Sequence, residues 1–173
     1  MQAFTFWKTV TVDDANLLDH LITLLKEHRV RFCVIGGQGV NAYVEPLVSL
    51  DLDVVIAAEQ IDEVEALLAR EFRIEHFPHS LNISRPGSDL RVQIQKDPRY
   101  ADFVPRATAR RVLGVTLPVA TVEDLVRGKV WAAQDQTRRA SKRQKDLADI
   151  ARLIEAYPAL RPLVPPDILA RLV

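Results

Sequence analysis

The stretch that decides the fold is Ile35-Gly36-Gly37, followed after residues 38–50 by Asp51-Leu52-Asp53-Val54-Val55. The glycine pair ends one short apolar run, and the two aspartates begin the next. Side chains alternate between the faces of a strand, so Asp51 and Asp53 must point the same way. Two neighbouring carboxylates repel each other and lose hydration, which a fold rarely accepts for stability alone. A divalent cation between them would explain the pair, because Mg²⁺ binds carboxylate and phosphate oxygens. The alternative is two solvated acids at a strand end, and the upstream glycines argue against it.

Length and composition predict one domain, or one domain with a small helical part appended. The chain has 173 residues, 48% of them hydrophobic, which is enough for a core and too many for disorder. Its 23 basic and 23 acidic residues balance, so net charge neither favours nor excludes nucleic acid. The single cysteine, Cys33, excludes an internal disulfide, and its apolar neighbours predict a buried, inert thiol. No signal-peptide core and no apolar run of roughly 18 residues is found, so we expect a soluble, cytoplasmic protein without membrane contact.

Apolar spacing and turn residues predict strands in the middle of the chain and helices towards its end. Strands are expected at 31–35, 50–57, 73–77, 81–84, 90–94 and 110–119, and helices at 14–28, 40–44, 60–72, 122–134 and 143–157, before a last short helix. Asp13 and Asp14 can cap the first helix, and Thr121 with Asp124 resembles a capping box. The Pro86-Gly87 turn predicts a hairpin. The pattern indicates an α/β or α+β core followed by a helical segment.

The order of these motifs resembles the nucleotidyltransferase superfamily with the DNA polymerase β-like fold. Residues 34–53 are similar to bacterial minimal nucleotidyltransferases related to the AbiEii toxins of toxin–antitoxin and phage-defence systems. Residues 120–129 resemble the family's Glu-Asp-Leu…Lys helix, and residues 143–150 its Arg-x-Lys-Asp-Leu-x-Asp-Ile helix. The resemblance covers residues 30–157.

The resemblance implies a mixed sheet flanked by helices. It predicts an α/β core over residues 1–119, with a helical segment over residues 120–173 packed on that core.

The resemblance also implies an enzyme that moves a nucleoside monophosphate from an NTP to a hydroxyl, with Mg²⁺ or Mn²⁺ as cofactor. Asp51 and Asp53 would bind the metal, and Lys129 would approach the nucleotide phosphates. Gly36 and Gly37 would let backbone N–H groups reach the triphosphate, because a Cβ would obstruct it. The other residues expected to bind the nucleotide are Ser49, Arg143 and Lys145. The family suggests an RNA acceptor and a cognate antitoxin as partners.

The third carboxylate that active members usually carry is absent, and Gln93 stands at its place. An amide coordinates Mg²⁺ poorly and cannot act as a base. Asp89 lies on the same face of that strand but roughly 13 Å away, so it could serve as a third metal ligand only if the strand bends. Leu47 replaces the arginine that usually precedes the aspartate pair. A degenerate member that binds nucleotide or a partner without turnover therefore stays open as an alternative.

Three further features have competing explanations. A basic cluster at Arg138, Arg139, Lys142, Arg143 and Lys145 could receive a triphosphate or an RNA end, or could be a solvated helix face. Asp146 and Asp149 share a helix face and could pair with Arg143 or Lys145 and position Lys129, or form a structural ion network. Trp131 is expected in the core rather than as a stacking platform for a base.

An antibiotic nucleotidyltransferase shares the core motif and is another alternative. It would need an acidic pocket for a cationic drug, and no such pocket is identifiable in the sequence.

Overall fold

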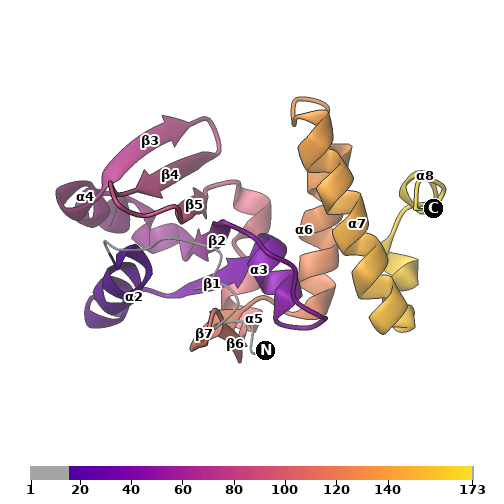
Figure 1. The fold of residues 1–173 in the computed structure, drawn as a ribbon, viewed down its shortest axis with the longest axis horizontal. Coiled ribbons are helices and arrows are strands. Elements are labelled where there is room, and N and C mark those ends of the chain that lie inside the picture. The colour runs from indigo at the N-terminus through magenta and orange to yellow at the C-terminus, as the bar shows by residue number, and fades with distance from the viewer. Residues whose placement is uncertain (1–15, 173) are drawn as a thin grey trace.

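A computed structural model describes residues 16–172, which form three layers with a mixed sheet in the middle (Figure 1). The sheet has seven strands in the order β3-β4-β5-β2-β1-β7-β6. The strands are β1 (Phe32–Ile35), β2 (Asp51–Ile56), β3 (Arg73–Phe77), β4 (Ser80–Ser84), β5 (Arg91–Gln95), β6 (Thr108–Val112) and β7 (Val115–Val119). The helices are α2 (Leu17–Glu27), α3 (Gly36–Asn41), α4 (Ile61–Glu71), α5 (Phe103–Arg106), α6 (Val122–Gln134), α7 (Ala140–Ala156) and α8 (Pro166–Leu169). Short 3₁₀ turns lie at η1 (Ala58–Gln60), η2 (Pro98–Tyr100) and η3 (Pro158–Leu163).

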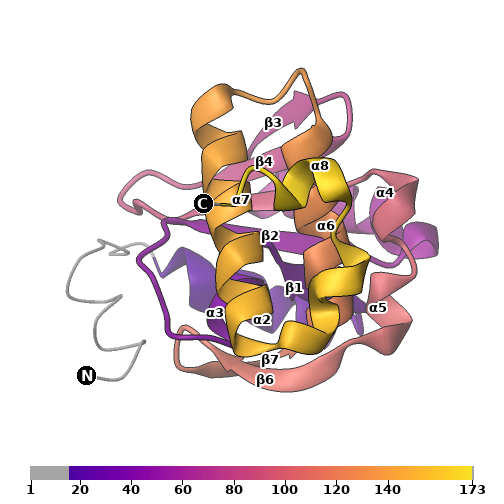
Figure 2. The same ribbon diagram turned by 90° about the vertical axis from the view of Figure 1, so that its right-hand side faces the viewer.

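Each face of the sheet buries a separate apolar core. Leu52 and Val54 of β2 pack in the core that α2 and α4 cover. Val55 packs in the opposite core, which α6 and α7 cover. Figure 1 shows α2 and α4 on one side of the sheet, and Figure 2 shows α6 and α7 in front of the other side. Because strand side chains alternate, Asp51 and Asp53 face the same side as Val55, towards α6 and α7.

The predicted fold class is confirmed, as a mixed sheet flanked by helices and followed by C-terminal helices. The strand predicted over 110–119 is wrong as a single strand, because β6 and β7 form an antiparallel hairpin there. Leu113 and Gly114 turn the chain with φ of 51° and 81°. Two successive residues with positive φ are typical of a tight hairpin turn, and a leucine rarely adopts such a φ. The alternating pattern therefore concealed the turn.

The starts of two helices also differ from the predictions. The helix expected over 40–44 begins at the glycine pair itself, as α3. The first helix, α2, begins at Leu17, and the proposed caps Asp13 and Asp14 lie outside the described residues.

Helix α6 is held firmly at its N-terminus, which fixes the position of its later residues. The Thr121 hydroxyl accepts the backbone N–H of Asp124 at 3.2 Å, as the predicted cap requires. The Asp124 side chain is fully buried and accepts two bonds from Arg106, at 2.8 and 2.9 Å, and one from Arg127 at 2.9 Å. A buried carboxylate satisfied in this way anchors the first turn of the helix.

Cys33 is buried, as its apolar neighbours predict. Burial, with a smaller effect of Asp124, raises the pKa of its thiol to about 12. The thiol is therefore unreactive at neutral pH. Within residues 16–172, no helix combines the length and the apolar character needed to cross a membrane.

Candidate active site

The two aspartates of β2 lie between β1 and β5 in the middle of the sheet. Asp53 is paired in register with Ile35 of β1 and with Gln93 of β5. Asp51 is paired with Arg91. The neutral side chain of Gln93 therefore lies next to Asp53, at the position where the third carboxylate was expected.

Gly36 and Gly37 differ in what surrounds them. Gly36 has a φ of +65°, and a Cβ added there would lie 2.8 Å from the carboxyl carbon of Asp53. Gly36 is therefore needed both for its backbone conformation and for room beside Asp53. A Cβ on Gly37 would make only ordinary van der Waals contact with the Ser49 side chain, at 3.7 and 3.9 Å, so this position has room for a small side chain at the start of α3. The Ser49 hydroxyl accepts the backbone N–H of Asp51 at 3.3 Å and helps to fix the start of β2.

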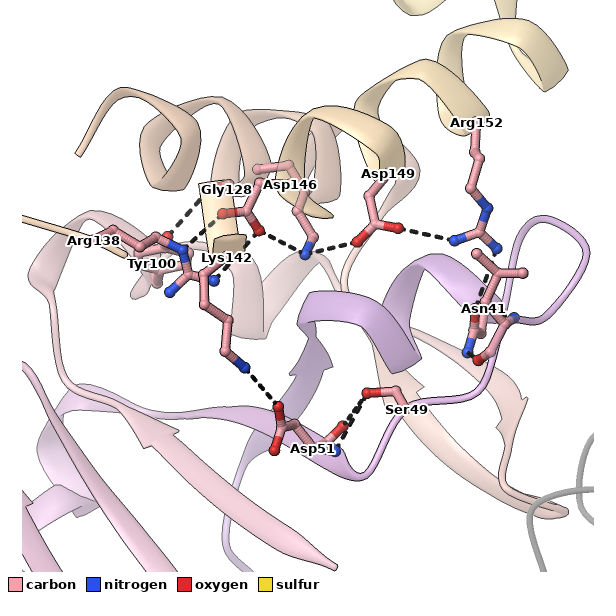
Figure 3. A network of polar contacts seen from close by, with 12 residues as sticks. Asn41, Ser49, Asp51, Tyr100, Gly128, Arg138, Lys142, Asp146, Asp149 and Arg152 are labelled. Carbon is pink, nitrogen blue, oxygen red and sulfur yellow. Dashed lines mark hydrogen bonds and ion pairs between the residues drawn. The ribbon is translucent and has the colours of Figure 1, made fainter. Parts of the chain in front are cut away.

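Asp51 is bound by two basic side chains from different elements. Lys142 of α7 lies 3.0 Å from its Oδ2, and Nε of Arg91 on β5 lies 2.9 Å from its Oδ1. Figure 3 shows Lys142 reaching from the helix down to the strand. Each Asp51 oxygen thus already pairs with one basic side chain. A carboxylate has about four lone-pair sites, so these two contacts leave room for further ligands.

Asp53 is half-buried, as Asp51 is, and packed protein surrounds much of its carboxyl group. Burial raises its pKa to about 6, against the opposing attraction of Lys129, and the charge of Asp51 adds to the rise. Arg138 and Lys142 also favour the ionised form. At neutral pH the fold therefore holds a costly carboxylate close to three cations, which offset part of the cost of its charge.

Lys129 projects from α6 into a network of acids on α7. Its amine lies 3.0 Å from Asp146 and 2.9 Å from Asp149, and the residue is only 9% exposed. Burial opposes the charge of this amine, but Asp149 and Asp146 outweigh that effect and raise its pKa. Lys129 is therefore a fixed cation at neutral pH.

The expected contact of Asp146 and Asp149 with Lys129 is confirmed, but their expected arginine and lysine partners on α7 are not. In place of Arg143 and Lys145, Asp146 binds Arg138 at 2.7 Å, and Asp149 binds Arg152 at 2.9 Å (Figure 3).

Asp53 and Lys129 both line a cavity of about 410 Å³ between the sheet and α6. Gly36, Gln93 and Arg138 line it as well. A further part of the lining is aromatic and comprises Tyr100, Phe103 and Trp131. The rings of Phe103 and Trp131 are stacked with centroids 5.7 Å apart, and Tyr100 meets Trp131 edge-on at 5.1 Å. Trp131, expected in the core, thus packs on core residues and also faces the cavity.

Six of the residues expected at the site do not line this cavity: Gly37, Ser49, Asp51, Asp89, Arg143 and Lys145. Asp89 is exposed and precedes β5, and across residues 16–172 no group of three or more acidic, histidine or cysteine side chains could hold a metal ion. Lys145 is exposed on α7. Arg143 directs its guanidinium towards Gln136, at 3.5 Å, rather than into the cavity.

Two members of the basic cluster act on the aspartates of β2, and the sequence singled out neither of them. They are Arg138 and Lys142. A signal for Lys142 exists in the spacing, since Lys142, Asp146 and Asp149 lie four and three residues apart on α7 and so share one helix face.

Known proteins resemble this chain at the level of a family model and of the fold. A family model described as "Nucleotidyl transferase AbiEii toxin, Type IV TA system" matches residues 40–172. A search of curated proteins found no match.

Several solved structures share the fold. The antibiotic-resistance factor ANT(2'')-Ia superimposes with a TM-score of 0.58 at 14% identity, over 85% of this chain and 88% of its own. The lincosamide antibiotic adenylyltransferase LnuA, in its lincomycin-bound form, gives 0.54 at 14% identity, over 83% and 99%. An antigenic nucleotidyltransferase-like protein from Paracoccidioides brasiliensis gives 0.52 at 17% identity, over 94% of both chains. At these identities the similarity is one of fold.

Proposed function

The chain belongs to the AbiEii nucleotidyl transferase family, and on this premise we propose that it transfers a nucleoside monophosphate from an NTP to a hydroxyl group at an RNA end, as the toxin of a toxin–antitoxin pair. The observation that carries the proposal is the aspartate pair on β2, held against Lys129, Arg138 and Lys142 at the cavity between the sheet and α6. In this proposal the α/β part, residues 1–119, supplies the carboxylates, and the helical part, residues 120–173, supplies the cations.

The donor set at the aspartate pair fits one magnesium or manganese ion. Asp51 and Asp53 offer hard carboxylate oxygens on one face of one strand, and Mg²⁺ in proteins is usually held by one or two carboxylates together with substrate phosphates and water. A bound ion would neutralise phosphate charge and draw the reacting oxygens together. We propose Asp51 and Asp53 as its ligands.

In this proposal Lys129, Arg138 and Lys142, each also paired with an aspartate, bind and orient the triphosphate. Lys129 and Arg138 border the cavity, and Lys142 lies at the Asp51 carboxylate beside it. The absence of a Cβ at Gly37 lets phosphate oxygens approach the backbone. In the proposed reaction the acceptor oxygen bonds to the α-phosphorus, the bond to the α–β bridging oxygen breaks, pyrophosphate leaves, and the hydroxyl proton passes to water.

Nucleotide binding without turnover is the second candidate, and Gln93 is the observation that favours it. Its amide lies beside Asp53 in register and cannot take the place of a carboxylate as metal ligand or base. We propose Gln93→Asp as the variant that separates the two candidates.

A cationic antibiotic is the less suitable acceptor for this cavity, although two structural neighbours are antibiotic-modifying proteins. Three of the acidic residues that line the cavity are bound to cations: Asp97 to Arg99, Asp124 to Arg106, and Asp146 to Lys129. These pairs leave little negative charge to attract a cationic drug.

The proposal is tested by label transfer from each α-³²P-NTP to total RNA in the presence of Mg²⁺ or Mn²⁺. We expect labelled RNA with the wild-type chain and none with Asp51→Ala or Asp53→Ala. Metal-dependent NTP binding without labelled RNA, together with labelling by Gln93→Asp, would establish the second candidate instead.

A further inference from the structure

The segment from the end of α6 to the first turns of α7 is strongly basic, although the chain as a whole has no net charge. Residues 135–145 contain five basic side chains and a single acid, Asp135. That acid is engaged locally, because its carboxylate accepts the backbone N–H of Thr137 at 2.9 Å and the hydroxyl of Thr137 at 2.7 Å. Positive charge is therefore concentrated on one short stretch of the surface.

The five cations of this stretch divide into two that are paired and three that are not. Arg138 is paired with Asp146, and Lys142 with Asp51. Throughout residues 16–172, no acid forms an ion pair with any of the other three, which are Arg139, Arg143 and Lys145. Arg139 and Lys145 are exposed and Arg143 is half-buried. The protein itself therefore does not neutralise these three charges.

The guanidinium of Arg143 also has unused hydrogen-bond donors. One of its terminal nitrogens lies 3.5 Å from the Gln136 oxygen, and its Nε is buried without a hydrogen-bond partner in the part of the chain that the structure describes. A guanidinium carries five N–H donors in a planar fork that matches a phosphate group. Because a buried donor without a partner is unfavourable, an external anion that reached Arg143 would satisfy it.

The start of α7 is a costly place for so much positive charge. The N-terminus of a helix already carries a partial positive charge. The first turn of α7 contains no acidic residue, and no side chain caps it at Arg139. Arg139 and Arg143 are four residues apart, a spacing at which like charges repel on a helix. Phosphate groups bound along this turn would relieve each of these repulsions.

The three unpaired cations lie around the helix position that contacts the proposed metal site. Lys142, in the same stretch, reaches Asp51 at 3.0 Å (Figure 3). A helix turns about 100° per residue, so Arg139 and Arg143 lie on one side of Lys142 and Lys145 on the other. From Arg139 to Lys145 the helix rises about 9 Å. An RNA strand whose terminal hydroxyl reached Asp51 would therefore bring its neighbouring phosphates to these cations.

We propose that Arg139, Arg143 and Lys145 form the surface that binds the phosphate backbone of the RNA acceptor. The paired cations Arg138 and Lys142 serve the nucleotide instead. This inference rests on the proposed function and assigns its acceptor surface. Phosphate contacts supply much of the affinity of proteins for RNA and make it depend on salt, because each contact releases bound counterions.

The test is binding of a 5′-fluorescein-labelled, single-stranded oligoribonucleotide to the full chain, followed by fluorescence anisotropy over a range of salt concentrations. We expect Arg139→Gln/Arg143→Gln/Lys145→Gln to bind at least about tenfold more weakly at about 0.1 M salt. Its slope of log K against log salt should be smaller by about 2, since each contact to a single strand contributes about 0.7. The double variant Arg139→Gln/Lys145→Gln keeps the half-buried arginine and should reduce the slope by about 1.4.

A matched control removes the same charge from another surface. Lys26, Arg70 and Arg73 are exposed on α2, α4 and β3, which Figure 1 shows away from α7. Their triple replacement by glutamine should leave the RNA affinity within about threefold of wild type, because charges beyond a Debye length are largely screened.

The outcomes separate the inference from the function on which it rests. An unchanged slope in the α7 variants, an equal loss in the control, or no RNA binding by the wild type would overturn the inference. Polyglutamate that displaced the labelled RNA as well as unlabelled RNA of equal charge would assign this surface to an acidic protein instead. A non-hydrolysable Mg²⁺–NTP analogue should bind the α7 variants as it binds wild type, because none of the three residues lines the cavity. Failure of the wild type to bind any such analogue would overturn the proposed function, whatever the RNA result.

Discussion

Replacing Asp53 with asparagine should stabilise the metal-free protein, because the carboxylate is held where its charge is costly. Burial raises the pKa of Asp53 to about 6, whereas an aspartate in an unfolded chain titrates near 3.9. A gap of about two pH units corresponds to about 3 kcal/mol, because each unit is worth about 1.4 kcal/mol. Since the residue also borders the cavity, about 3 kcal/mol is an upper value. Asparagine has nearly the same shape and no charge, so Asp53→Asn should recover much of this free energy at pH 7.

The direction of the stability change with pH follows from how tightly the folded and unfolded states hold the Asp53 proton. A folded-state pKa above the unfolded one means that the folded state holds the proton more tightly, so the aspartate destabilises the fold increasingly as pH rises from about 4 to 6. The advantage of Asp53→Asn should therefore be absent near pH 4, grow between pH 4 and 6, and stay constant above pH 6. At pH 7 it should raise the melting temperature by roughly 5 to 10 °C for a chain of this size.

The assay is urea unfolding of wild type and variant from pH 4 to 8, with EDTA present. Asp51→Asn is the matched control, since Asp51 is partly exposed and already paired with Arg91 and Lys142. Its effect should stay within about 1 kcal/mol. A less stable Asp53→Asn protein at pH 7, or a difference that does not change with pH, would refute the account of this buried charge.

Three other predictions concern the glycine pair, the buried lysine and the metal. Gly36→Ala should lower the free energy of unfolding by about 2 kcal/mol or more, because the new Cβ strains a positive φ and meets Asp53. Gly37→Ala should lower the free energy of unfolding by less than about 1 kcal/mol and should weaken NTP binding. Equal losses of stability for the two variants in urea unfolding would contradict this difference between the glycines. Lys129→Met should cost about 3 kcal/mol, because it leaves the buried Asp146 and the half-buried Asp149 with one cation fewer. Lys145→Met, on the exposed face of α7, should change stability by less than about 0.5 kcal/mol. Mg²⁺ at about 100 times its Kd should stabilise the wild type by about 2.7 kcal/mol in thermal unfolding. The same stabilisation of an Asp51→Asn/Asp53→Asn double variant would show that the ion binds at a site other than these aspartates.

Much of the fold could be predicted from the sequence because its local signals agree with one another. Leu52 and Val54 alternate with the two aspartates, which is enough to define β2 and the face its acids occupy. Thr121 defines the start of α6 through a local cap. The β6–β7 hairpin was missed because its turn places Leu113 at a positive φ, which the residue type does not indicate.

Only those residues of the candidate site that belong to a sequence motif could be predicted. The aspartate pair and Lys129 stand out in the sequence, but Lys142 contacts Asp51 across 91 positions, and only helix packing brings them together.

If the chain transfers a nucleoside monophosphate at the cavity beside Asp51 and Asp53, the transferred label must come from the α-phosphate of the NTP. The most direct measurement compares RNA labelled from α-³²P-NTP with RNA labelled from γ-³²P-NTP, using the wild-type chain and the full set of four nucleotides. Label from the α position alone, lost in Asp53→Asn although that variant remains folded, is the predicted result. Label from the γ position, or α label that persists in Asp53→Asn, would contradict the claim.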